Sequence, residues 1–183
     1  MKRKERNVAM AVRPIVVVPH EVLNTKAREI EEIDEYVRKL AYDMADTMYQ
    51  APGIGLAANQ VGEPVRLVVV DVQYAYAEPK DKKKNPIIVL NPRITTCEGE
   101  EIMEEGCLSV PDFNVEVARS QCVRVEGVSL DGKPVKIEAE GLLARVFQHE
   151  IDHLDGTTLL EHASALKRNL YRRRLKKKGR RAS

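Results

Sequence analysis

Apolar residues recur along this chain with two different spacings, and the spacings predict different elements. Between residues 31 and 48 they fall three to four positions apart, which is typical of one buried face of a helix. This stripe is made by Ile33, Val37, Leu40, Met44 and Met48. Acidic residues crowd the first turn, where they favour the helix dipole. We therefore predict a helix over residues 31–48, ended by Pro52-Gly53.

The other apolar stretches are short, rich in β-branched residues and bounded by turn residues, which is typical of strands. The predicted strands cover residues 15–18 (a short strand or an extended arm), 65–72, 87–90, 93–103 (weaker), 121–130 and 135–139. Asn91-Pro92 is expected to end the 87–90 strand, and Asp131-Gly132 is a hairpin turn signal. The polar segment 73–85 predicts a surface loop.

A second helix is predicted to begin at Gly141 and to end before Gly156. Its residues Leu142, Val146, His149 and His153 form one continuous stripe. A third helix is basic and carries scattered apolar residues from Ala165 onward. Because strands follow one another in series, without alternation with helices, we predict an α+β fold. Mostly antiparallel β-sheets would pack around the second helix, with an N-terminal helix and a basic C-terminal helix.

Length and composition set the class of protein. A chain of 183 residues, 43% hydrophobic, fits one domain with tails. No run of eighteen apolar residues is present, so we expect no membrane-spanning helix. The basic N-terminus is not followed by an apolar segment, so no secretory signal is expected. The odd number and wide spacing of Cys97, Cys107 and Cys122 favour free thiols in a reducing, cytoplasmic setting.

Charge is unevenly distributed along the chain. Residues 164–183 hold ten Lys and Arg and no acid, whereas the other 163 residues hold 20 basic and 28 acidic side chains, a formal charge of −8. A basic tail of this kind indicates contact with a polyanion, most simply nucleic acid, although solvated charge is the common alternative. We expect a disordered basic leader over residues 1–12, a folded domain over 13–165 and a basic helix or tail over 166–183.

The second helix carries a His-Glu-x-x-His pattern. His149 and His153 lie four residues apart on one face and can hold one metal ion, while Glu150 can reach a water molecule on that metal. The alternative is a buried helix with two hydrogen-bonded histidines. The best candidate for a third ligand is Cys107, a soft ligand in a short segment between predicted strands. A small buried hydrophobe is the alternative for any cysteine, and we adopt it for Cys97 and Cys122.

Three stretches together resemble the three motifs of the peptide deformylases, in the same order and at similar spacing. They are Gly-Ile-Gly-Leu-Ala-Ala-Asn-Gln at 53–60, Glu-Gly-Cys-Leu-Ser at 105–109 and His-Glu-Ile-Asp-His at 149–153. The resemblance covers roughly residues 13–165. It implies hydrolysis of the N-formyl group from N-formylmethionyl nascent polypeptides, giving formate and a free amine. It also implies one Fe(2+) per chain, which Zn, Ni or Co can replace.

The resemblance further implies a role for each motif residue. Cys107, His149 and His153 would bind the metal, and Glu150 would act as general acid and base on a metal-bound water. The side-chain amide of Gln60 and the backbone N–H of Leu108 would stabilise the tetrahedral oxyanion. A C-terminal helix that docks on the ribosome is known in this family, so we expect the basic tail to bind ribosomal RNA. No membrane partner is expected.

A further group is expected to bind the substrate. It comprises Gly53, Ile54, Gly55, Met103, Glu105, Leu142 and Val146. The glycines leave room for substrate backbone, and the four apolar residues can wall a pocket for the methionine side chain, with plain core as the alternative. Glu105, beside the ligand Cys107, is expected to hold a neighbouring backbone or an arginine. Asp152 is more typical of an ordinary surface acid.

Two other functions share parts of this pattern. A zinc endopeptidase would use the same helix and the same role for Glu150, but it needs room for an internal peptide bond. A non-catalytic RNA-binding protein would use the basic tail, but it has no need of a general base at Glu150.

Overall fold

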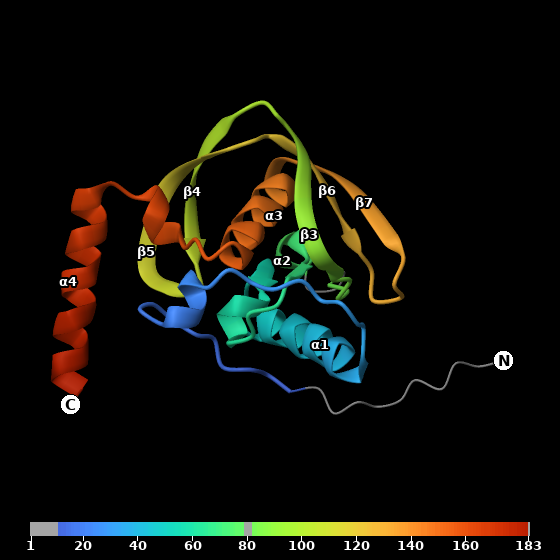
Figure 1. The fold of residues 1–183 in the computed structure, drawn as a ribbon. Helices are drawn as coiled ribbons and strands as arrows, with labels where there is room; N and C mark the ends of the chain where they lie inside the picture. The colour runs from blue at the N-terminus through green and yellow to red at the C-terminus, as the bar shows by residue number, and fades with distance from the viewer. Residues whose placement is uncertain (1–10, 79–81, 183) are drawn as a thin grey trace.

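A computed structural model of the protein describes residues 11–78 and 82–182. Its strands form two antiparallel sheets, one of five strands in the order β1-β2-β3-β6-β7 and one made by β4 and β5. Helix α3 lies between these sheets, α1 lies below them, and α4 stands at one side (Figure 1). The α+β fold with mostly antiparallel sheets around a central helix is therefore confirmed.

The strands are β1 (Gly55–Ala57), β2 (Leu67–Val70), β3 (Ile87–Glu98), β4 (Glu101–Cys107), β5 (Val110–Arg119), β6 (Cys122–Val128) and β7 (Pro134–Glu140). The helices are α1 (Glu35–Gln50), α2 (Val72–Tyr76), α3 (Gly141–Leu154) and α4 (Ala165–Ala182). Short 3-10 turns are η1 (Glu21–Asn24), η2 (Ala58–Val61) and η3 (Leu159–His162).

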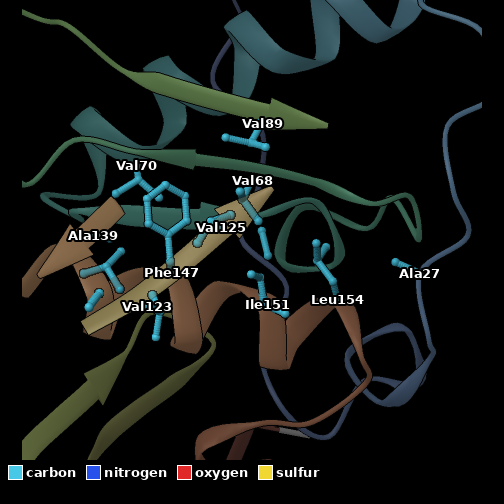
Figure 2. Close-up of a cluster of buried hydrophobic side chains, with 13 residues drawn as sticks. Ala27, Val68, Val70, Val89, Val123, Val125, Ala139, Phe147, Ile151 and Leu154 are labelled. Atoms are coloured by element: carbon cyan, nitrogen blue, oxygen red, sulfur yellow. The ribbon is translucent and has the colours of Figure 1, made fainter. Parts of the chain in front are cut away.

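Strand β2 is buried on both faces, as its continuous apolar run predicts. Val68 and Val70 belong to the core shared with α3, whereas Leu67 and Val69 belong to the core shared with α1. Figure 2 shows Phe147 of α3 pointing toward these strands, and its side chain is fully buried. Burying such a side chain contributes about 1.5–3 kcal/mol, so the core fixes α3 against the sheet.

Helix α1 begins four residues later than the sequence predicts. The side chain of Asp34 accepts a hydrogen bond of 2.8 Å from the backbone N–H of Val37 and so caps the helix. The acidic residues before Asp34 lie outside the helix. Its predicted stripe is buried at Leu40, Met44 and Met48, so the predicted face is correct although the start is not.

Two strand predictions were wrong, the end of the 87–90 strand and the single strand over 93–103, whose residues are divided between β3 and β4 on either side of Gly99 and Glu100. Strand β3 does not end at Asn91-Pro92 but continues to Glu98, with its register shifted between Leu90 and Arg93. Proline is tolerated there because a bulge interrupts the ladder. The Asn91 backbone has φ of 50°, and its side chain hydrogen-bonds both the N–H and the carbonyl of Ile30.

Strand β5 was missed, and part of the predicted loop 73–85 is helical. In β5 the buried residues alternate at Phe113, Val115, Val117 and Arg119, but Pro111, Asp112 and Asn114 are poor strand formers. Helix α2 is a single short turn, capped by the side chain of Asp71 on the N–H of Tyr74. Residues 79–81 of the predicted loop lie outside the described residues.

The described residues begin at Ala11, just before an extended arm. The predicted leader lies outside the described residues, except for Ala11 and Val12. Residues 15–18 form an extended arm with no strand partner, one of the two predicted alternatives. No helix in the described part of the chain is long and apolar enough to span a membrane.

Candidate active site

Helix α3 carries five of the predicted site residues, and Gly156 sets where the helix ends. Gly156 follows the helix with φ of 78°, and a Cβ there would lie 2.9 Å from the carbonyl oxygen of Asn24. The helix therefore ends where Gly156 predicts. Cys107 is the last residue of β4, rather than part of a connecting segment as predicted, so a strand end holds its thiol near the helix.

Cys107, His149 and His153 come together although 42 or more residues separate the cysteine from the histidines. The candidate ligand atoms of all three lie within 4.8 Å of one another. The Sγ of Cys107 is 3.2 Å from Nε2 of His153. One sulfur that can ionise and two imidazoles make a donor set typical of a transition metal, so these residues fit the metal that a His-Glu-x-x-His helix predicts.

Glu105 orients one of these histidines. Its Oε2 lies 3.0 Å from Nδ1 of His149, which leaves Nε2 of that ring for a metal. Two arginines hold the same carboxylate: Arg119 makes bonds of 3.0 and 3.1 Å, and Arg145 makes one of 2.7 Å. Burial raises the pKa of Glu105, but the hydrogen bonds from His149 and Arg119 outweigh it and lower this pKa to about 2. Glu105 is therefore an ionised acceptor.

The network extends to the surface through Asp152. Arg119 donates to Oδ2 of Asp152 at 2.6 Å, and Nε2 of His162 lies 3.0 Å from the same oxygen. Asp152 is therefore no ordinary surface acid. The partner expected for Glu105 was a neighbouring backbone or an arginine, and the structure places two arginines there, Arg119 and Arg145. Arg119 is the last of the alternating buried residues of β5, and this alternation is the sequence signal that indicates an inward-facing side chain.

Glu150 lies in a buried and confined setting. It is 4% exposed, and its Oε2 has no hydrogen-bond partner among the described residues. A Cβ on Gly55 would lie 2.5 Å from Oε1 of Glu150 and 2.6 Å from Cγ1 of Val146, so only glycine fits there. Burial raises the pKa of Glu150 to about 7. A carboxyl group with this pKa can both accept and return a proton near neutral pH.

Gln60 is the polar residue of η2 that faces the metal ligands. Its Oε1 accepts a 2.8 Å hydrogen bond from the N–H of Ala57, and its Nε2 lies 3.7 Å from Sγ of Cys107. The accepted bond fixes which end of the amide is free to donate. Leu108 follows Cys107 directly and is half-buried against the α1 core, so its backbone lies beside the same cluster.

These residues surround one pocket of about 670 Å³. Its lining includes every predicted site residue except His153, which is 1% exposed behind it. The lining residues that the sequence analysis did not identify are Pro52, Ala75, Tyr76, Glu104, Gly106 and Arg145. Ala75 and Tyr76 come from α2, which was predicted as loop. Arg145 lies on the predicted helix four residues before His149, and so on the same face, but a charged side chain is seldom buried.

Comparison with known proteins gives consistent matches along nearly the whole chain. A family model described as polypeptide deformylase matches residues 12–169. The chain is 48% identical over 169 residues to a peptide deformylase of Thermodesulfovibrio yellowstonii, covering 92% of this chain and 99% of that protein. It is also similar to the crystal structure of a peptide deformylase from Legionella pneumophila, with a TM-score of 0.83 and 44% identity over 93% of this chain and 96% of that one.

A third similar structure carries a bound molecule. The crystal structure of peptide deformylase from Ehrlichia chaffeensis in complex with actinonin has a TM-score of 0.84 and 39% identity. It covers 92% of this chain and 98% of that one.

Proposed function

The chain belongs to the polypeptide deformylase family, metal-dependent hydrolases of the N-formyl amide, and we propose how its own residues bind N-formylmethionyl peptides and carry out that hydrolysis. The proposal rests on one arrangement. The candidate ligand atoms of Cys107, His149 and His153 converge, and beside them lies the buried carboxylate of Glu150, one oxygen of which has no hydrogen-bond partner among the described residues.

The substrate peptide binds as an added strand. Strand β1 ends the order of the five-stranded sheet and β4 has one partner, so among the described residues each has an edge without a neighbouring strand. Residues of both strands line the pocket. Main-chain hydrogen bonds to such edges would hold an extended formylated peptide. The methionine side chain occupies the pocket between Ile54, Met103, Leu142 and Val146, which lies beside the candidate ligands.

Cys107, His149 and His153 hold the metal. A bound metal ion would supply Lewis acidity to a water molecule and to the formyl oxygen. Glu105 keeps the His149 ring in the orientation that leaves Nε2 free. We assign Fe(2+) to the site on the resemblance to the deformylases, and Zn, Ni or Co can replace it because a thiolate with two imidazoles suits all four. Metal analysis of protein purified without oxygen tests this assignment: iron near one per chain supports it, and zinc alone contradicts it.

Glu150 moves the proton. It accepts a proton from the water that attacks the formyl carbon, and it delivers that proton to the departing nitrogen. The negative charge on the formyl oxygen is stabilised by the Nε2 amide of Gln60 and the N–H of Leu108. Removing one such donor typically raises the barrier by about 3–4 kcal/mol. Gly55 supports this assignment because it admits the Glu150 carboxylate to the pocket wall.

The direct test is formate release from formyl-Met-Ala-Ser by the wild type and by Glu150→Gln, with bound metal measured in both. The variant keeps the shape of the side chain but cannot accept the proton, so we expect normal metal content and activity lower by about 10²–10⁴-fold. Activity close to wild type would contradict the role of Glu150. Incubation with casein is the control for specificity, since peptide fragments would indicate an endopeptidase instead.

We also propose that α4 docks the enzyme on ribosomal RNA, with residues 13–165 as the catalytic unit, 166–183 as the docking helix and the cytoplasm as its location. The exposed cations of α4 support this, and three free cysteines suit a reducing compartment. The test variant changes Arg172, Arg173, Lys176 and Lys177 to Glu. Its matched control changes four exposed cations of the body, Lys26, Arg38, Lys83 and Lys133, to Glu.

Both variants alter the net charge equally, so their difference isolates the helix. We expect the α4 variant to lose co-sedimentation with ribosomes at low salt while it still deformylates a short peptide, and the control to co-sediment. Equal co-sedimentation of both variants would end the docking proposal.

A further inference from the structure

The extended arm of residues 13–18 connects two segments of the active site that are far apart in sequence. The backbone N–H of Val16 donates to the carbonyl of Gln60 at 2.8 Å, and the N–H of Val18 donates to the carbonyl of Ser109 at 3.0 Å. Gln60 carries one of the two proposed oxyanion donors. Ser109 directly follows Leu108, whose N–H is the other.

Both hydrogen bonds are made by the same edge of the arm's backbone. In an extended chain the N–H groups of residues two apart point the same way, so Val16 and Val18 face the site together. Val18 is buried and Val16 packs on the same core, whereas Val17 is 46% exposed. The N–H of Val17 makes no hydrogen bond within the described part of the chain. Two extended residues span about 6.6 Å, which sets the separation of the two carbonyls.

No other backbone hydrogen bond bridges this gap. Within the described residues, none joins η2 directly to residues 107–109, and the side-chain contact from Gln60 to Cys107 is 3.7 Å long. Among the described residues, the arm is therefore the backbone hydrogen-bonded link between the segment of the Gln60 amide and that of the Leu108 N–H, in addition to the packing of Leu108 on the core that contains Ala58 and Val61 of η2.

The other end of the arm is attached outside the active site. The N–H of Arg13 donates to Oγ1 of Thr47 at 2.8 Å. The Arg13 guanidinium pairs with Asp43 at 3.3 Å and with Glu63 at 2.8 Å. Asp43 and Thr47 are buried residues of α1. The arm is thus held to α1 at one end and to the site at the other.

We propose that the arm is a positioning strap, in which the N–H groups of Val16 and Val18 set the separation between the Gln60 amide and the Leu108 N–H. The inference rests on the proposed function of those two donors. An oxyanion hole works only when its donors lie about 2.7–3.1 Å from the developing charge. A misplacement of about 1 Å by a change outside the chemistry can cost about 10²-fold in rate. The strap therefore acts on the transition state through Gln60 and Leu108.

Proline substitution tests the strap because it removes an N–H and keeps an extended backbone. Val16→Pro removes the hydrogen bond to Gln60. Val17→Pro is the matched control, because the N–H of Val17 makes no hydrogen bond within the described residues. In the full-length zinc-loaded protein we expect Val16→Pro to lower kcat by about 10–100-fold, with KM and zinc content near wild type. Val17→Pro should stay within about twofold of the wild-type kcat.

Several results would overturn the strap. These are a wild-type kcat in Val16→Pro, an equal loss in Val17→Pro, or a loss that falls on KM or zinc content instead of kcat. Gln60→Ala distinguishes a failure of the strap from a failure of the proposed function. A wild-type kcat in Gln60→Ala would show that Gln60 does not stabilise the oxyanion. If Val16→Pro does not fold, Arg13→Ala decides by loosening the far attachment. A several-fold fall in kcat at constant KM supports the strap, and an unchanged kcat overturns it.

Discussion

Helix α3 lies between the two sheets, whereas α4 stands at one side of the molecule (Figure 1). Nine of the 14 residues of α3 are buried, and four of these are polar or charged: Arg145, Gln148, Glu150 and His153. In α4, among the side chains that the structure describes, Tyr171 is the one that is buried. Both helices carry apolar and charged residues, but their charged side chains have different surroundings.

The difference lies in what surrounds the charges. On α3 the Arg145 guanidinium donates to Glu105 and to the carbonyls of Val117 and Glu101, so its removal leaves buried acceptors without donors. On α4 the Arg174 guanidinium pairs with Asp112 at 3.5 Å, and both side chains are 56% exposed. Exposed pairs contribute little to stability. Charge on α3 therefore maintains the site, and charge on α4 is available to a partner.

The largest effect should come from a proposed metal ligand on α3. His153→Ala removes one of two imidazoles, so we expect no stoichiometric metal and formate release lower by at least about 10³-fold, since several kcal/mol of charge stabilisation are lost. The measurement is bound metal and turnover of formyl-Met-Ala-Ser. His162→Ala is the control, because its ring contacts Asp152 outside the cluster. A variant with full metal and activity would remove His153 from the site.

The same substitution in both helices sharpens the comparison next. Arg145→Met should lower the free energy of unfolding by about 3–5 kcal/mol, because a buried ion pair is broken and the carbonyls of Glu101 and Val117 lose their donor. Arg174→Met should lower it by less than about 1 kcal/mol. Urea unfolding of the zinc-loaded variants measures both. Equal losses would show that α4 is held as firmly as α3.

A smaller effect is expected at the attachment of α4. The hydroxyl of Tyr171 donates to the carbonyl of Pro111 at 2.8 Å, and its ring stacks against Phe113 at 4.9 Å between centroids. Tyr171→Phe keeps the ring and removes the hydrogen bond, so we expect a loss of about 1 kcal/mol and unchanged turnover. Hydrogen exchange in α4 should become faster. Protection equal to that of the wild type would mean that other contacts hold the helix.

The smallest effect is expected on the exposed side of α4. Leu166 and Leu170 are 71% and 56% exposed, so changing both to Ser should alter the free energy of unfolding by less than about 0.5 kcal/mol. Thermal unfolding at two protein concentrations checks this. A clear loss of stability that depends on concentration would reveal that a second copy covers these leucines.

The local pattern was enough to predict α1 and α3, because burial of one face leaves a period in the sequence. It also predicted the burial of β2 on both faces, because such a strand is a continuous apolar run. It failed where the period was hidden or interrupted. In β5, Pro111 and Asn114 obscured a strand that alternates in burial, and at Asn91-Pro92 a bulge let β3 continue. The contribution of α2 to the pocket was missed because a single turn capped by Asp71 has no period to detect.

The sequence by itself determined the fold class and a pair of histidines on one helical face, since both depend on neighbours within a few turns. The motif resemblance also named Cys107 as the third ligand, whereas only the tertiary structure decided which arginines hold Glu105 and where the arm of residues 13–18 attaches. Cys107 meets His153 across 46 residues, and Arg145 meets Glu105 across 40. Contacts between distant residues depend on the path of the whole chain, and a local pattern of polarity carries no information about that path.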